Sequence, residues 1–218
     1  MYIKDHLVKN IMLKMAILIS GRGSNMDAIL SSHEQSELKN IEPSVVISDK
    51  KEAPGLKIAK EKFGIATEVI LSNGKKGWEY DQEIDSILKD YGVYPSNGII
   101  CLAGYMRILS TEFVRKYKLR ILNVHPSLLP SFKGLHAQKQ AFDYGAKISG
   151  CTVHFIDDDV DTGPIIIQEC VPIYGSDTEE DLSNRILQIE HKLYPLAIKL
   201  FSDGKLKIDG RKVHLLEK

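Results

Sequence analysis

Two polar side chains end an apolar segment in the middle of the chain. In LNVHPSLLPSFKG, residues 122–134, Asn123 and His125 are two residues apart, so on a β-strand both point to the same side of a sheet. An amide beside an imidazole suits acyl transfer, because the amide can stabilise a developing oxyanion while the imidazole moves a proton. A histidine that ends a strand with its hydrogen bonds satisfied is the ordinary alternative.

An acidic stretch, HFIDDDVDTGPIIIQ at residues 154–168, places four aspartates between two apolar segments. A turn of this composition is usually a solvated loop, and the twelve-residue pattern of a calcium loop is missing. Asp161 differs from the other aspartates because the sequence DTGP fixes the turn behind it. If Asp161 meets His125 in space, its carboxylate would orient the imidazole and favour the charged form.

A glycine loop, SGRGSN at residues 20–25, lies between an apolar segment and a helical pattern. Such a loop presents backbone N–H groups and the positive end of a helix to an anion. The dinucleotide-binding pattern is incomplete, because Met26 stands in place of its third glycine and the next strand ends with only Asp49 as an acidic residue. The loop therefore suits a single phosphate, to which Ser24 and Asn25 could donate hydrogen bonds. A tight turn with either residue as helix N-cap is the alternative.

Composition narrows the class of protein. The 29 basic and 29 acidic side chains cancel, which argues against a nucleic-acid or membrane protein held by bulk charge. No apolar segment is long enough to span a bilayer, and residues 1–15 are too polar for a secretory signal. The three cysteines, Cys101, Cys151 and Cys170, lack the spacing of a disulfide framework or a zinc site. We therefore expect a cytoplasmic protein with reduced thiols and no metal.

The elements that must position these residues alternate along the first two thirds of the chain. The pattern of apolar residues predicts strands at 15–20, 43–48, 66–71, 97–105 and 119–125, and helices at 26–35, 56–64, 78–92 and 111–118. Strands that are apolar on both faces and separated by helices indicate a parallel sheet covered on both sides. Asn123 and His125 then lie at the carboxyl end of a parallel strand, where open α/β sheets bind ligands.

The pattern changes after residue 150. GCTVHFI, GPIIIQECVPI and KLKIDGRKVHLL are each predicted as a strand. Residues 177–201 are predicted as a helix that opens with a capping box of Asp177 and Glu180 and is kinked or split at Pro195. The predicted fold class is α/β, a Rossmann-like, mostly parallel sheet with helices on both faces and a mixed C-terminal half that completes the same sheet. We predict a single domain over 15–218 after an N-terminal extension over 1–14.

Five segments together resemble the phosphoribosylglycinamide formyltransferases, the folate-dependent GAR transformylases of purine synthesis. They are ISGRGSN, LAGYMRILS, NVHPSLLPSFKGLHAQKQA, VHFIDDDVDTGPII and IEHKLYP, in the family's order and spacing from about Met15 to Gly210. The histidine and aspartate segments are shared with all 10-formyltetrahydrofolate formyltransferases. SGRGSN is narrower and indicates the branch that acts on glycinamide ribonucleotide.

The resemblance implies a role for each part of the site. Gly23, Ser24 and Asn25 would bind the ribose phosphate of the substrate, and Glu190 its ribosyl-glycinamide part. Asn123, His125 and Asp161 would be the catalytic residues. The residues that would bind the folate are Lys76, Met106, Arg107, Ile108, Leu109, Asn123, Asp157, Asp158, Asp159, Val160 and Asp161.

Lys76 is named because the family's basic residue, three positions before the Tyr-Asp of EYDQE, is replaced here by Gly77. The resemblance also implies a cis peptide bond between Leu129 and Pro130.

The reaction implied is transfer of the formyl group of 10-formyltetrahydrofolate, a co-substrate, to the amine of glycinamide ribonucleotide, without a metal. The amine attacks directly, because no serine or cysteine is placed to act as a covalent nucleophile. Two alternatives remain: a formyltetrahydrofolate hydrolase, in which water is the acceptor, and a non-catalytic phosphate-binding module. We expect small-molecule partners, no nucleic acid or membrane partner, and a monomer or weak homodimer.

Overall fold

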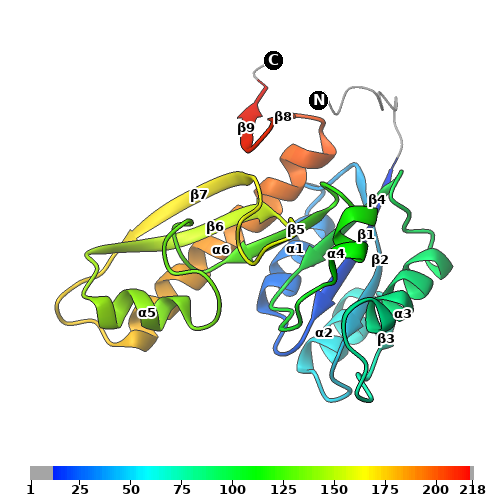
Figure 1. Cartoon of the computed structure of the whole chain (residues 1–218), viewed down its shortest axis with the longest axis horizontal. Coiled ribbons are helices and arrows are strands. Elements are labelled where there is room, and N and C mark those ends of the chain that lie inside the picture. The colour runs from blue at the N-terminus through cyan, green and yellow to red at the C-terminus, as the bar shows by residue number, and fades with distance from the viewer. Residues whose placement is uncertain (1–11, 217–218) are drawn as a thin grey trace.

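The computed structural model describes residues 12–216, in which a seven-stranded sheet lies between two layers of helices (Figure 1). The strand order is β3-β2-β1-β4-β5-β6-β7. The first part of the chain contributes β1 (Leu13–Ile19), α1 (Ser24–Glu34), β2 (Ile41–Ser48), α2 (Pro54–Phe63), β3 (Thr67–Val69), α3 (Gly77–Asp90), β4 (Gly98–Leu102), α4 (Thr111–Lys116) and β5 (Ile121–His125). All nine elements predicted there are confirmed, and β1 to β5 pair in parallel.

Burial on both faces of the central strands explains why they are continuously apolar. In β1, Met15, Ile17 and Ile19 belong to a core shared with α1, α2 and the long helix α6 (Glu179–Ser202). Ala16 and Leu18 point to the other face, into a core shared with α3 and α4. The alternation of side chains along a strand thus feeds two separate cores, one under each helical layer.

The C-terminal part reverses the strand direction. It contributes α5 (Ala137–Tyr144), β6 (Ile148–Phe155), β7 (Ile165–Pro172), α6, β8 (Leu206–Asp209) and β9 (Lys212–Leu215). β6 and β7 extend the sheet by antiparallel pairing, as the predicted mixed half requires. α5 is not predicted from the sequence, because it buries little beyond Ala137 and Ala141.

Two details of the C-terminal predictions are wrong. KLKIDGRKVHLL is two strands, not one, because the chain turns at Gly210, with φ of 58°, and β8 and β9 form their own two-stranded sheet at the upper edge of Figure 1. The capping box consists of Thr178 and Asp181, because Asp177 is held by Arg185 and by the backbone N–H of Tyr174.

Pro195 does not split α6, which runs without interruption past it. The neighbouring residues Leu193, Tyr194 and Ala197 are buried against the sheet, and their packing offsets the lost backbone hydrogen bond.

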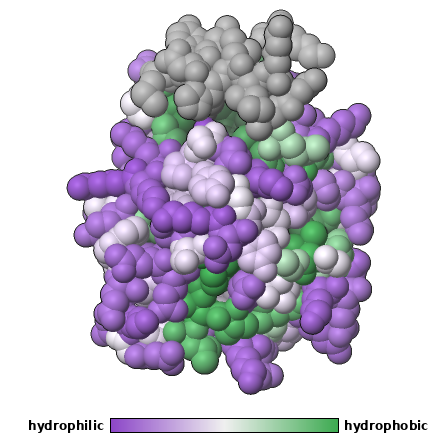
Figure 2. All heavy atoms as spheres, turned by 90° about the vertical axis from the view of Figure 1, so that its right-hand side faces the viewer, coloured by the Kyte–Doolittle hydropathy of each residue, from purple (hydrophilic) through white to green (hydrophobic). Residues whose placement is uncertain are grey.

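The predicted cis peptide between Leu129 and Pro130 is confirmed. Most of the extension predicted over 1–14, including residues 1–11, lies outside the described residues, and β1 begins at Leu13, two residues before the predicted strand. No helix of residues 12–216 is both long and apolar enough to cross a bilayer. Figure 2 shows that hydrophilic side chains predominate on the face at the right of Figure 1, with apolar side chains reaching the surface in smaller patches.

Tyr194 of α6 ties together the two strands that lead to the candidate site. Its ring is fully buried, and its hydroxyl lies within hydrogen-bond distance of the carbonyl oxygens of Leu102 (3.1 Å) and Leu122 (2.8 Å), on β4 and β5. Burial raises the pKa of this hydroxyl well above its ordinary value, so it remains a donor.

We therefore expect Tyr194→Phe to lower the free energy of unfolding by about 1–2 kcal/mol, the net value of a buried hydrogen bond. Urea unfolding measures the change. The matched control is Tyr174→Phe, at an exposed tyrosine, which should change stability by less than about 0.5 kcal/mol. Equal losses in the two variants would contradict a special role for the Tyr194 hydroxyl.

Candidate active site

The end of β5 carries the first two candidate catalytic residues. Both residues pair with the antiparallel strand β6. Asn123 lies opposite His154, and His125 lies opposite Thr152. The His125 residue is only 4% exposed. Both residues therefore lie where the parallel half of the sheet meets the antiparallel half, at the carboxyl end of β5.

Asp161 reaches this point from the connection between β6 and β7. The chain turns sharply there: Phe155 donates a backbone hydrogen bond to the carbonyl of Pro164, and a Cβ on Gly163 would lie 1.8 Å from the carbonyl oxygen of Phe155. Asp161 itself has a positive φ of 51°. The turn brings its Oδ2 to 3.3 Å from Nδ1 of His125, with the two side chains 9% and 5% exposed. The contact between His125 and Asp161 that the sequence suggests is thus present.

Both ring nitrogens of His125 face hydrogen-bond acceptors. Nδ1 faces the Asp161 carboxylate, and Nε2 lies 2.8 Å from the carbonyl oxygen of Phe132. An imidazole donates from both nitrogens only when it is protonated, and the carboxylate balances the resulting charge. Each ring nitrogen of His125 thus has an acceptor for its proton, and a protonated ring could give one of those protons to a reacting group.

His154 is a member of this cluster that sequence reasoning missed. Its side chain is fully buried, its Nδ1 lies 2.9 Å from the carbonyl oxygen of Phe155, and its Nε2 lies 3.3 Å from Nδ2 of Asn123 and 3.7 Å from Oδ1 of Asp161. Burial lowers the pKa of His154, so the ring is neutral, donates from Nδ1 and accepts at Nε2. This acceptor orients the Asn123 amide. His154 lies beside Asn123 because β5 pairs with β6. The alternation of His154 with Val153 and Phe155 in the sequence does not reveal that pairing.

The glycine loop forms the second part of the site. Gly23 has φ of 77° and precedes the first residue of α1, Ser24. A Cβ on Gly23 would lie 2.9 Å from Cα of Gly55, so the residue is glycine for both conformational and steric reasons. The loop presents the N-terminus of α1 to its surroundings, as an anion site requires.

Asn25 joins this loop to α6. Its Nδ2 donates to Oε2 of Glu190 at 2.7 Å, across 165 positions of sequence, while its Oδ1 is buried without a hydrogen-bond partner. Burial raises the pKa of Glu190, and the hydrogen bond from Asn25 opposes that shift. The structure thus brings together two residues that the sequence analysis named separately.

The segment after β4 combines exposed and anchored side chains. Met106 and Ile108 are 59% and 79% exposed, whereas Leu109 is buried in the core under α3. The backbone N–H of Met106 donates to the Ser20 hydroxyl at the end of β1. The guanidinium of Arg107 lies 3.8 Å from the centre of the Tyr80 ring and donates to the carbonyl of Lys75. Arg107 therefore ties its segment to the turn before α3.

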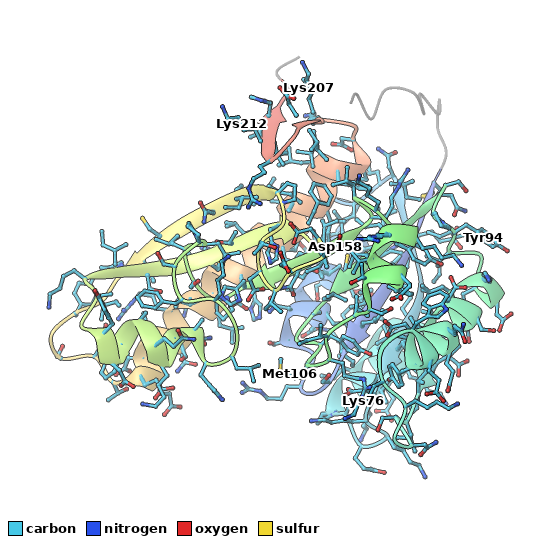
Figure 3. The ribbon with its side chains drawn as sticks, viewed as in Figure 1. Lys76, Tyr94, Met106, Asp158, Lys207 and Lys212 are labelled. Atoms are coloured by element: carbon cyan, nitrogen blue, oxygen red, sulfur yellow. The ribbon has the colours of Figure 1, made fainter. Side chains whose placement is uncertain are left out.

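The remaining predicted folate residues lie on two loops (Figure 3). Lys76 is exposed immediately before α3, on the loop that Arg107 contacts. Asp158 pairs with Arg115 at 3.0 Å, and Asp157 accepts a hydrogen bond from Thr162. In the same loop, Asp159 and Val160 are exposed. These contacts fix the loop on either side of its exposed tip.

Two further observations concern groups of possible metal ligands and a cavity. Within residues 12–216, no group of three or more His, Cys, Asp or Glu side chains is arranged to hold a metal ion. A cavity of about 720 Å³ lies elsewhere, between the C-terminal half of α1 and α6. Its lining includes His191 and Lys192 but none of the candidate catalytic residues, so we place the chemistry at the side-chain cluster rather than in that cavity.

Comparison with known proteins identifies the family of the chain. The model of a family described as formyl transferase matches residues 13–198. The chain belongs to the formyl transferase family.

Relatives of this family match along nearly the whole chain. The phosphoribosylglycinamide formyltransferase of Escherichia coli K12 is 40% identical over 90% of this chain and 90% of its own length. The crystal structure of glycinamide ribonucleotide transformylase 1 from Symbiobacterium toebii is 43% identical, with a TM-score of 0.88 over 94% of this chain and 95% of that one. The trifunctional purine biosynthetic protein adenosine-3 of Bos taurus is 47% identical over 89% of this chain, which spans only 19% of that protein.

The buried, neutral His154 predicts a pH dependence of stability. The pKa of His154 is lowered in the folded protein and returns to about 6.5 in the unfolded chain, so the unfolded state binds more protons as the pH falls below that value. This group therefore leaves stability unchanged well above pH 6.5 and lowers it at more acidic pH. We expect wild type to lose stability relative to His154→Gln below about pH 6.5, with a limiting slope of about 1.4 kcal/mol per pH unit.

Urea unfolding at a series of pH values measures this difference. The exposed His214, changed to Gln, serves as the control and should leave the pH profile as in wild type. Profiles of wild type and His154→Gln that run parallel would show that His154 is not held neutral.

Proposed function

We propose that the chain transfers the formyl group of 10-formyltetrahydrofolate to the amine of 5-phosphoribosylglycinamide in purine biosynthesis. The observation that carries the proposal is the side-chain cluster of Asn123, His125, Asp161 and His154 at the end of β5. An oriented amide beside a carboxylate-paired imidazole is suited to a tetrahedral intermediate. The likeness in sequence and fold to proteins named for this reaction gives further support.

The chemistry follows from the positions of these groups. The amine of the ribonucleotide attacks the formyl carbon, a new C–N bond forms, and the carbonyl oxygen becomes an oxyanion. The amide N–H of Asn123 that does not face His154, together with the imidazolium of His125, stabilises that oxygen. Asp161 accepts a proton from the attacking amine directly or through solvent, and N10 of the folate receives the Nδ1 proton of His125 as the bond from N10 to the formyl carbon breaks.

The products are formylated ribonucleotide and tetrahydrofolate, and no covalent enzyme intermediate forms. The carboxylate of Asp161 then returns its proton to the imidazole over the 3.3 Å that separates the two groups. Holding both substrates in line contributes a large part of the acceleration.

The glycine loop holds the phosphate of the ribonucleotide in this proposal. Backbone N–H groups of Gly23 and Ser24 and the N-terminus of α1 receive the anion, and Asn25 and Glu190 meet the ribosyl-glycinamide part. The buried, unpartnered Oδ1 of Asn25 supports this assignment, because a ligand N–H or O–H would satisfy it.

The folate lies between the segment after β4 and the loop after β6. The exposed apolar side chains of Met106, Ile108 and Val160 offer contacts to a planar ring, and the backbones of Arg107, Leu109 and residues 157–161 offer hydrogen bonds to its edge. The exposed Lys76 binds the acidic tail of the folate. The Arg107 side chain is not free to do so, because it packs on the Tyr80 ring and donates to the carbonyl of Lys75.

The proposal also covers the partners, oligomeric state and cellular location of the chain. The chain acts on small molecules alone, as a monomer or weak homodimer and in the cytoplasm, within a single domain over 15–218. The three free thiols, of which Cys170 is exposed, support a reducing compartment. The balance of charged residues supports the lack of a nucleic-acid or membrane partner.

An assay with 10-formyltetrahydrofolate, with and without the ribonucleotide, tests the proposal against its two alternatives. We expect tetrahydrofolate to be released only when the ribonucleotide is present. Release at the same rate without it would indicate a hydrolase. Binding of the ribonucleotide without any release would indicate a phosphate-binding module.

The glycine loop yields a prediction that separates binding from folding. Ser24→Asp places a negative charge at the N-terminus of α1. This charge stabilises the helix by interacting with its dipole, but it repels a phosphate. We expect KM for the ribonucleotide to rise at least about tenfold, because like charges about 4 Å apart near a surface repel by a few kcal/mol. KM for the folate and the melting temperature should not fall.

Steady-state kinetics with each substrate varied in turn measures this effect. Ser31→Asp, two turns further along the same helix, is the control and should leave both KM values unchanged. An equal rise of both KM values in Ser24→Asp would place the phosphate elsewhere.

A further inference from the structure

The connection between β5 and α5 contacts both members of the His125–Asp161 pair with its backbone. The carbonyl oxygen of Phe132 lies 2.8 Å from Nε2 of His125, and the N–H of Gly134 donates to Oδ2 of Asp161 at 2.8 Å. These groups are two residues apart. A segment of three residues, 132–134, thus accepts from the imidazole and donates to the carboxylate.

This segment contains one backbone conformation, at Phe132, that its residue type does not favour. Phe132 has φ of 52°, a strained value for a bulky residue, and Gly134 has φ of 78°. Conformations of this kind persist only where surrounding contacts enforce them, and they gather at functional sites. The contacts that enforce this one are therefore part of how the pair is held.

Those contacts come from one face of α5. Gln140 donates from Nε2 to the carbonyl oxygens of Lys133 (3.0 Å) and Leu135 (2.9 Å). The ring of Tyr144 meets the ring of Phe132 edge-on, with 5.9 Å between centroids and 63° between planes. Tyr144 is 81% exposed, so it contributes little to the core, and its ring contact is made with Phe132.

We propose that Gln140 and Tyr144 are positioning residues for the reaction: they hold residues 132–134 so that the backbone of Phe132 and Gly134 fixes the orientation of the His125–Asp161 pair. The role of the pair in formyl transfer rests on the function proposed above. Neither α5 side chain bonds to His125 or Asp161, so each acts only through the segment between.

The consequence of loosening this segment is specific. Without the Phe132 carbonyl, the Nε2 proton of His125 has no acceptor in the protein and the ring is free to turn. Without the Gly134 N–H, Asp161 loses a donor that stabilises its charge. A misplacement of about 1 Å can cost about 10²-fold in rate while substrates still bind. The loss should therefore appear in kcat rather than in KM.

The test compares Gln140→Ala, Tyr144→Ala and the double variant with wild type. We expect kcat to fall about threefold or more in each single variant and at least about tenfold in the double variant, with both KM values within about twofold. Tyr144→Phe keeps the ring and should retain wild-type kcat. Tyr94→Ala, at an exposed tyrosine on the far side of the molecule (Figure 3), is the matched control and should be silent.

A spectroscopic readout separates positioning from general destabilisation. The ring nitrogens of His125 are followed by NMR as a function of pH, with His125→Ala for assignment. We expect the Nε2–H signal of His125 to weaken and to exchange faster with solvent in the double variant, with the His154 signals unchanged. Gly134→Ala disturbs the same segment through its φ alone, because a Cβ there meets nothing within 4 Å, and should give the same change.

Unchanged kcat and an unchanged His125 spectrum in the double variant would overturn the proposal, as would an equal loss in Tyr144→Phe and Tyr144→Ala. If the double variant does not fold, the two single variants and Gly134→Ala decide the matter by the same criteria. A changed His125 spectrum in a protein whose wild type lacks transferase activity would contradict the proposed function and leave the positioning intact.

Discussion

The antiparallel pairing of β5 with β6 is the constraint on which the site depends. Parallel pairing of β1, β4 and β5 brings the glycine loop, the 103–109 segment and the end of β5 to one edge of the sheet. The reversal at β6 then sets His154 opposite Asn123, and the turn into β7 returns Asp161 to His125. A one-residue slip in this register would turn His154 to the other face and leave the Asn123 amide without its acceptor.

Different hydrogen-bond partners give two buried histidines of the same cluster different chemistry. His154 is enclosed and neutral, with a pKa lowered by desolvation, and it serves as an acceptor that orients an amide. His125 is also buried, but a carboxylate and a carbonyl oxygen face its two nitrogens, so its charged form is compensated. Asp161 lies between the two rings, which couples an oriented donor to a proton source within a few ångströms.

Much of this arrangement could be predicted from sequence, for physical reasons that differ between elements. Strands apolar on both faces identified the parallel half, and residues two apart placed Asn123 and His125 on one side. The meeting of His125 with Asp161 followed from the family resemblance, because no local pattern fixes a contact across 36 positions. The role of His154 was missed because it depends on strand pairing, and α5 was missed because its function is to hold a backbone segment rather than to fill the core.

Coupling between His125 and Asp161 is the central claim, and a double-mutant cycle on kcat/KM near neutral pH tests it most directly. Groups that act as a unit are strongly non-additive, so the variant carrying both His125→Ala and Asp161→Asn should be within a few-fold of the poorer single variant. Circular dichroism must show each variant to be folded. Free energies of the two substitutions that add to within about 0.5 kcal/mol, as at distant independent sites, would contradict the account and leave Asp161 as an ordinary loop carboxylate.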